Sequence, residues 1–480
     1  MSSRRVASLV GWVVWILWGS QAVADIRLPK IFSDQMVLQR GESFAIWGTA
    51  DPNEMLTIQI ADRVATATAD STGAWRTRLE PPIGTGPFEL TIRGAQTKVV
   101  FQQVVVGEVW ICTGQLNMHA RIAEQPATPI SDADWTGFDL RLFHVPLKAT
   151  DHPQTDFAEP TVWERATAES MGRASAIAFH FGRELAQSLD VPVGVIVLST
   201  PEGSCESWIP WDKLTAVPAF QTILADWTTN EGERLSKNRP GNLFNGMVRP
   251  LLPFNVRGVT WYQGESEVGR HALLSQSLPI LLAAWREAFQ QPELRFCFLQ
   301  LPPFRYQGRP VDDLPRLWEV QTAVAGSPGA CLVETWDLPP PAELTQVDKR
   351  AVANRQAKTV LAQVYDRERP SHPQPAFKQA AVEGKRIRVE FDHVQRLELQ
   401  SDPALHPFQI CGADQQFQVA QVAIDGNRLW LSSDGIEHPV AVRYAWTDTP
   451  QLDLVDQEQR PIPPFRSDQF GAADEVQRGK

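Results

Sequence analysis

The sequence predicts an α/β protein in which a parallel-sheet body lies between two β-rich regions. Before Gln103, short runs alternate apolar and polar residues, the pattern of strands with one solvated face. Between Gln103 and Pro373, continuous apolar runs alternate with helical patterns, which indicates a parallel sheet covered by helices. Beyond Pro373 the alternating pattern returns. A chain of 480 residues is also long enough for about three domains at roughly 150 residues each.

The first β-rich region is expected over residues 25–103. Turn sequences such as Asp51-Pro52-Asn53 and Asp70-Ser71-Thr72-Gly73 separate its alternating runs, at residues 44–47, 56–60, 64–68 and 88–92. Short strands with turn residues between them are typical of a small β-sandwich.

The α/β body is expected over residues 104–368, and a C-terminal β-rich region over residues 369–480. Apolar runs without alternation predict buried strands of the body, at residues 104–106, 193–198, 258–262 and 296–299. Helical spacing of apolar residues predicts three helices, at residues 175–189, 278–289 and 348–365. In the last region, alternation predicts strands at residues 386–391, 428–431 and 440–446.

Residues 1–24 are expected to be a secretory signal peptide. Arg4 and Arg5 precede an apolar stretch from residue 6 to residue 18, and Ala22-Val23-Ala24 provides a cleavage site. The alternative is a membrane anchor, but the apolar stretch is shorter than the roughly 20 residues that a spanning helix needs. We therefore expect cleavage near Ala24 and a secreted or periplasmic protein.

The composition argues against several kinds of partner. The formal net charge is −11, and an acidic chain does not hold nucleic acid by neutralising phosphates. No basic run or second apolar span suggests a membrane surface. The five cysteines show no C-x-x-C spacing, so we expect no metal and no other cofactor. One disulfide is possible in an oxidising compartment, but the sequence does not pair it, nor does it give the oligomeric state.

One segment carries the main sign of function, a buried strand that runs into a tight turn: Gly107-Glu108-Val109-Trp110-Ile111-Cys112-Thr113-Gly114-Gln115-Leu116-Asn117-Met118. It resembles the nucleophile block of the sialate O-acetylesterase family, secreted carbohydrate-ester hydrolases of the SGNH class, whose version has serine in place of Leu116. The likeness extends over nearly the whole chain, through the runs 28–40, 106–110, 191–194, 243–247, 261–266, 442–446 and 464–466. It implies an SGNH-like, flavodoxin-like sheet and a carbohydrate or sialic-acid-like ligand.

The same resemblance implies that the reacting groups are replaced. Leu116 has no hydroxyl with which to attack a carbonyl. The family's base is a histidine in an Asp-Ile-His-Pro-x-Asn-Lys context, and here Thr345 takes its place in the run from Glu343 to Lys349. No histidine lies between His271 and His372, so a shift of the alignment by one residue does not restore the base. We place Asp337 and Glu343 among the acidic groups of the same site.

The oxyanion region is altered as well. Family members have a glycine pair where this chain has Pro201 and Glu202, and an asparagine where it has Glu267. Proline has no N–H to donate, and an ionised carboxylate accepts hydrogen bonds without donating them. We expect Glu202 and Glu267 to place negative charge where the oxyanion would form. Serine and histidine alone would then not restore hydrolysis.

Several family-like polar residues remain for binding, namely Gln115, Asn117, Gln263 and Glu265. Trp208, Trp261 and Trp336 could stack on sugar faces, although core packing is the commoner role of tryptophan.

Three hypotheses follow. The leading one is an exported esterase-like protein whose hydrolysis is lost or severely weakened, and which binds carbohydrate. The second is an active esterase with a rearranged nucleophile and base, for which Thr113, His119 and His180 are the candidates. The third takes the acidic residues as a glycosidase-like carboxylate pair.

Overall fold

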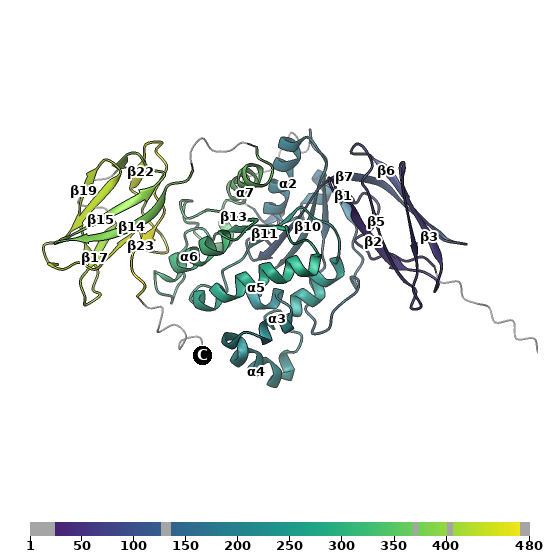
Figure 1. Cartoon of the computed structure of the whole chain (residues 1–480), viewed down its shortest axis with the longest axis horizontal. Coiled ribbons are helices and arrows are strands. Elements are labelled where there is room, and N and C mark those ends of the chain that lie inside the picture. The colour runs from purple at the N-terminus through teal and green to yellow at the C-terminus, as the bar shows by residue number, and fades with distance from the viewer. Residues whose placement is uncertain (1–24, 126–135, 368–372, 401–406, 471–480) are drawn as a thin grey trace, which may run out of the picture.

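The computed structural model describes residues 25–125, 136–367, 373–400 and 407–470. The expected signal peptide, residues 1–24, lies outside them. The chain forms an elongated row of three parts, with N-terminal strands at one end, the α/β body in the middle and C-terminal strands at the other end (Figure 1).

The N-terminal part consists of six short strands: β1 (Val37–Gln39), β2 (Phe44–Thr49), β3 (Met55–Ile60), β4 (Arg63–Thr68), β5 (Ala74–Leu79) and β6 (Phe88–Arg93). Strand β2 pairs with β5, and β3 pairs with β4 and β6, all antiparallel. The alternation in β3 buries Leu56, Ile58 and Ile60 and exposes the residues between them. One face of this sheet is therefore part of the core.

Strand β7 (Lys98–Gln115) joins the N-terminal part to the body. Residues 98–104 pair with β6, residues 105–107 with β1, and residues 108–115 with the strands of the body. Gln103 lies in the left-handed region, with φ of 58°, where the strand passes from one set of partners to the other. The pattern change at Gln103 thus falls inside a continuous strand.

The body is built on a sheet of order β13-β12-β11-β7-β10-β8-β9, parallel except for β9. After β7 its strands are β8 (Leu140–His144), β9 (Trp163–Arg165), β10 (Val193–Thr200), β11 (Gly258–Tyr262), β12 (Arg295–Leu299) and β13 (Ala330–Val333). Helices α2 (Ala176–Leu189) and α7 (Lys349–Val364) pack together, as do α5 (His271–Phe289) and α6 (Asp313–Ala325), and the two pairs lie on opposite faces of the sheet (Figure 1). The shorter helices are α1 (Ala168–Met171), α3 (Trp211–Thr215) and α4 (Gln221–Thr229). The predicted α/β fold is confirmed.

A disulfide joins Cys297 of β12 to Cys331 of β13, which face each other in register. The other three cysteines, Cys112, Cys205 and Cys411, are buried and free.

The C-terminal part is antiparallel. It contains the sheets β14-β15-β20-β19 and β18-β17-β21-β23 and the pair β16-β22. Its strands are β14 (Ala376–Glu383), β15 (Arg386–Asp392), β16 (Leu397–Leu399), β17 (Phe408–Cys411), β18 (Gln418–Val419), β19 (Gln421–Asp425), β20 (Arg428–Ser432), β21 (Ala441–Tyr444), β22 (Leu454–Asp456) and β23 (Phe465–Arg466).

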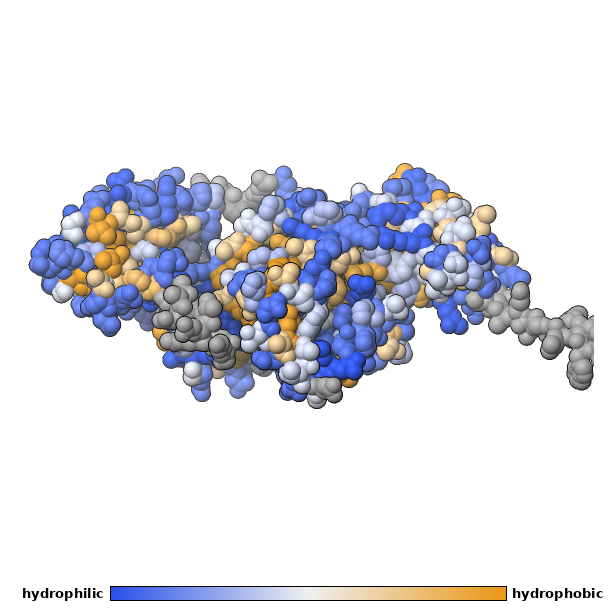
Figure 2. Space-filling view, turned by 60° about the horizontal axis from the view of Figure 1, so that its bottom comes forward, coloured by the Kyte–Doolittle hydropathy of each residue, from blue (hydrophilic) through white to orange (hydrophobic). Residues whose placement is uncertain are grey.

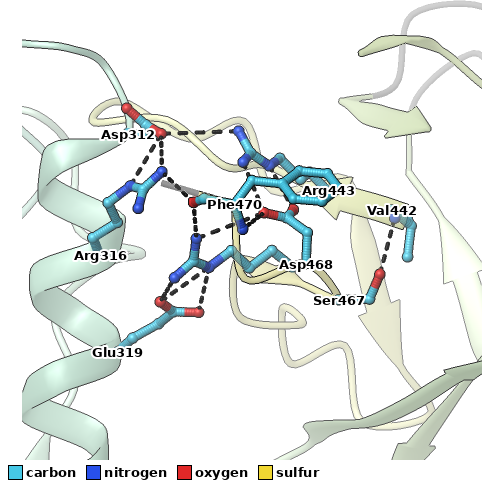
Figure 3. Close-up of polar contacts among 9 residues, drawn as sticks. Asp312, Arg316, Glu319, Val442, Arg443, Ser467, Asp468 and Phe470 are labelled. Carbon is cyan, nitrogen blue, oxygen red and sulfur yellow. Dashed lines mark hydrogen bonds and ion pairs between the residues drawn. The ribbon is translucent and has the colours of Figure 1, made fainter. Parts of the chain in front are cut away.

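Ion pairs join this part to α6 of the body. Arg466 binds Glu319 of α6, with an Nη2–Oε2 distance of 2.7 Å. Arg443 binds Asp468 at 2.8 Å and approaches Asp312 at 3.9 Å (Figure 3). Hydrophilic residues cover most of the face seen in Figure 2, with apolar residues gathered on the middle and C-terminal parts. No described helix is long and apolar enough to cross a membrane.

Candidate active site

The carboxyl ends of three neighbouring strands bring the expected site residues to one edge of the sheet. Leu116 follows β7, Ser199 and Thr200 end β10, and the segment from Gln263 to Glu267 follows β11. The backbone N–H of Leu116 donates to the carbonyl of Thr200 at 3.0 Å, which ties the first two ends together. Open α/β sheets bind ligands at this edge, beside the strand where the chain reverses its order.

The backbone at Leu116 keeps a special conformation. Its φ is 35°, in the left-handed region that leucine seldom adopts. Gly114, two residues earlier, has φ of 136°, and a Cβ there would lie 2.0 Å from the carbonyl oxygen of Tyr262. The close approach of β11 therefore requires glycine at 114.

A cavity of about 390 Å³ opens beside Leu116, and we call it the sheet-edge cavity. Its lining residues are Leu116, His119, Ala120, Glu124, Gln125, Glu343, Thr345 and Gln346. Leu116 thus shares one cavity with Glu343 and Thr345, which lie more than 220 residues later in the sequence. Buried Lys349 donates from Nζ to the carbonyls of Thr345, at 2.8 Å, and Val347, at 3.1 Å, so it fixes the turn that carries Thr345.

The predicted binding residues Gln115, Asn117, Gln263 and Glu265 and the predicted oxyanion residue Glu267 lie at the same strand ends, and we call them the buried layer. All are buried except Glu265, which is half-buried. None of them lines the cavity. The amide of Gln115 donates to Ser266 Oγ at 3.0 Å, and that of Asn117 donates to Glu265 Oε1 at 3.0 Å. The amide of Gln263 donates to the carbonyl of Gly203 at 2.8 Å. These groups hold the strand ends together.

Two carboxyl groups of the buried layer are protonated more readily than usual. Burial raises the pKa of Glu265 to about 7. Burial and the nearby Glu206 raise the pKa of Glu267 to about 8, while its Oε1 accepts the backbone N–H of Cys205 at 2.8 Å. At neutral pH Glu267 is therefore mostly a neutral acid whose hydroxyl can donate a hydrogen bond. The raised pKa favours a neutral Glu267, in contrast to the negative charge that the sequence predicted.

Glu202 lies in a solvated position. Its side chain is 66% exposed and lies 3.5 Å from Lys237 Nζ, so its charge is solvated and partly compensated. Pro201 precedes it and lacks an N–H donor. The next residue, Gly203, has φ of 148°, which accounts for a glycine at that point of the turn.

Other predicted residues are not part of the cavity. Asp337 binds Arg355 of α7 through both carboxylate oxygens and, with Trp336, lines a separate pocket near the C-terminal part. Trp208 and Trp261 are 0% and 1% exposed and pack edge to face in the core, so they have no free face for a sugar. Of the acids considered for a carboxylate pair, only Glu343 lines the cavity.

The structure reveals one pair that the sequence did not suggest. His119 Nδ1 lies 3.1 Å from Ser199 Oγ, and His119 lines the sheet-edge cavity. Burial, with a smaller contribution from Arg121, lowers the pKa of His119, which keeps its ring neutral near pH 7. Thr113 is fully buried, and His180 is a buried residue of α2 outside the cavity. The only sequence signal for Ser199 was a hydroxyl at the end of a buried strand.

Comparison with known proteins shows which proteins the chain resembles. Human sialate O-acetylesterase is 26% identical to it over an alignment of 498 positions, gaps included, that covers 94% of each protein. A carbohydrate acetylesterase from Xanthomonas citri is 29% identical, superposes with a TM-score of 0.81, and is matched over 93% of this chain and 100% of its own. The chain is similar to sialate O-acetylesterases over nearly its whole length.

The family resemblance read from the motifs is therefore confirmed. Mouse sialate O-acetylesterase is 24% identical, over 88% of this chain and 90% of that protein. No family model matches the sequence. The relatives are named as ester hydrolases, whereas the roles of the residues in this chain's cavity are a separate question.

Proposed function

We propose that this chain is an exported, esterase-like protein that binds O-acetylated carbohydrate and has lost most or all ester hydrolysis. The observation that carries the proposal is the presence of Leu116 and Thr345 on the wall of one cavity. By the family motif, these positions would hold the serine and the histidine. A leucine side chain cannot form the acyl-enzyme bond, and a threonine hydroxyl cannot take up the nucleophile's proton near pH 7.

The size of the expected loss is large. Removing the serine or the histidine from a hydrolytic triad costs about 10⁶-fold in turnover, and the two losses are not additive. A missing oxyanion donor costs roughly another 10²–10³-fold. Binding can survive this loss, because the cavity keeps polar groups such as Gln125, Glu343 and Gln346.

Binding and turnover should be measured on the same preparation of the chain. We expect O-acetylated N-acetylneuraminic acid to give saturable binding by isothermal calorimetry, without release of acetate. Thr345→Trp, at an exposed residue of the cavity wall, should abolish the binding. Thr229→Trp, at the exposed end of α4, is the matched control and should bind normally. Absence of binding in the unmodified chain would refute the carbohydrate role.

The pair Ser199–His119 supports a second candidate, an active esterase with a relocated nucleophile. A neutral histidine within 3.1 Å of a serine hydroxyl has the geometry of a general base and its nucleophile. In this reading, Ser199 Oγ attacks the acetyl carbonyl and its proton passes to His119. The bond between the acetyl carbon and the sugar oxygen breaks, and the sugar oxygen takes the proton from His119. Water then gives a proton to His119 as it attacks the acetyl-serine, acetate is released, and the proton returns to Ser199 Oγ.

Variants separate the two candidates. Saturable release of acetate that disappears in both Ser199→Ala and His119→Gln, but not in Ser275→Ala, would establish the second candidate. Ser275 is an exposed serine of α5 and serves as the matched control. Acetate release that persists in both variants would point to a contaminant or to a different nucleophile.

A further inference from the structure

A second pocket, of about 580 Å³, lies between the N-terminal part and the body. We call it the arginine pocket, because Arg27, Arg76 and Arg249 all line it. Arg27 is anchored to β2 by two backbone hydrogen bonds with Thr49, of 2.9 and 2.8 Å. It shares no lining residue with the sheet-edge cavity.

The positive charge of this pocket is not compensated. Among the described residues, no acidic side chain lies within 4.0 Å of the guanidinium group of Arg27, Arg76 or Arg249. Asp156, an acid of the pocket wall, is held by Lys30, with an Nζ–Oδ2 distance of 3.1 Å. In a chain with a net charge of −11, three arginines around one pocket without acidic partners form an unusual local field.

Several arginines elsewhere in the described part of the chain bind a carboxylate directly. Arg40 and Arg257, for example, both bind the buried Glu108, at 2.6 and 2.9 Å. Arg76 instead donates from Nη2 to the side-chain oxygen of Gln290 at 3.0 Å, which orients the guanidinium group without neutralising it. The guanidinium group is therefore oriented by a neutral partner and keeps its full positive charge.

An aromatic wall completes the pocket. Trp47 of β2 is partly exposed and is held from behind by Phe32, edge to face at 4.7 Å between ring centroids. The amides of Gln154 and Gln290 lie on the same wall. An indole face, two amides and unpaired arginines together match a sugar ring that carries a carboxylate.

We propose that the arginine pocket binds an acidic saccharide, with the sugar ring on Trp47 and its carboxylate on the arginines. The volume of the pocket is in the range of small-molecule sites, which are about 300–1,000 Å³. This proposal does not depend on the state of the sheet-edge cavity. Bound sugar would lie between the N-terminal part and the body, away from Leu116.

Ligand-observed NMR and calorimetry with glucuronic acid as the probe test this proposal. We expect saturable binding of glucuronic acid and none of glucose, which has the same ring without the carboxylate. Arg76→Gln and Arg249→Gln should each weaken the binding by about tenfold or more, because each removes a charge-assisted hydrogen bond. Thermal unfolding checks that the variants fold.

Arg78→Gln is the matched control. Arg78 lies two residues from Arg76 on the same face of β5, is exposed, and binds Ser43 outside the pocket. Its variant should bind like the unmodified chain. Equal weakening by Arg78→Gln, or no effect of Arg76→Gln and Arg249→Gln, would overturn the proposal. Inorganic sulfate that competes as well as glucuronic acid would also overturn it, because the pocket would then recognise only an anion.

Discussion

The wall of the sheet-edge cavity and the buried layer differ in what they keep of the family pattern. In the layer, Gln115, Asn117, Gln263 and Glu265 are the residues that the family motifs lead one to expect, and all of them are hydrogen-bonded. On the wall, Leu116 and Thr345 replace the expected serine and histidine. The difference teaches that groups which hold the strand ends are separable from groups which carry out the reaction.

The physical reason is burial. A polar group of the layer that loses its partner stays unsatisfied inside the protein, at a cost of about 1–3 kcal/mol. A group on the wall faces the cavity, so its replacement leaves the strand ends as they were. The following predictions test this separation, from the largest expected effect to the smallest.

Restoring the two lost groups should give the largest effect. We expect Leu116→Ser with Thr345→His to raise aryl acetate hydrolysis by about 10³-fold or more, because the loss of such a pair costs about 10⁶-fold and a donor missing at Pro201 leaves part of it unrecovered. From the sequence alone we predicted that serine and histidine would not restore hydrolysis. We now expect a gain, because Glu202 faces solvent and Glu267 is mostly neutral at pH 7. Each single variant should stay at background. An equal gain from Leu116→Ser alone would mean that a working base is already present.

The free energy of unfolding should depend on the buried layer and not on the cavity wall. Asn117→Ala removes the donor to Glu265 in the buried layer, and we expect it to lower the free energy of unfolding by about 1–3 kcal/mol. Thr345→Ala, at an exposed wall residue, should change it by less than about 0.5 kcal/mol. Urea unfolding measures both. Equal effects would contradict the separation of layer and wall.

The buried layer should also make stability depend on pH. Glu267 has an ordinary pKa of 4.5 when unfolded and about 8 when folded, so the folded chain binds the extra proton between these values. The free energy of unfolding should therefore fall as the pH rises from about 4.5 to 8, by up to about 1.4 kcal/mol per pH unit from this group. Glu267→Gln should remove this contribution. The same slope in the variant and the unmodified chain would show that Glu267 is not buried as a neutral acid.

The smallest effect is expected at Glu202. Because its carboxylate is exposed, Glu202→Gln should leave the free energy of unfolding within about 0.5 kcal/mol and should not change hydrolysis in the Leu116→Ser, Thr345→His background. A large gain in hydrolysis would restore the original view that Glu202 opposes the oxyanion.

Much of the fold was predictable because the spacing of apolar residues along the chain indicates which face of a strand or helix is buried. The continuous apolar run that ends at Leu198 became β10, and the helix predicted over residues 175–189 became α2, with the Ser175 hydroxyl as its cap. Helix α6 was missed because Pro315 and buried Arg316 interrupt its apolar pattern, and the ion pairs that hold it come from the distant C-terminal part.

The candidate site was predictable only where a motif fixed a position. The shared cavity of Leu116 and Thr345 follows from two motifs, one at the end of β7 and one in the turn before α7. The neutral state of Glu267 depends on burial and on Glu206, and the solvated state of Glu202 depends on Lys237. The pair Ser199–His119 forms only because the ends of β7 and β10 lie side by side. Asp337 binds Arg355 of α7 and lies outside the cavity. These contacts depend on tertiary structure, which a single sequence pattern does not contain.

The most direct test of the central claim is intact-mass spectrometry of the purified chain after exposure to a serine-directed phosphonate, with turnover of an aryl acetate measured in parallel. The account predicts no covalent adduct and turnover at the background rate, because leucine stands where the reactive hydroxyl would be. A stoichiometric adduct that disappears in Ser199→Ala, together with saturable turnover, would contradict it.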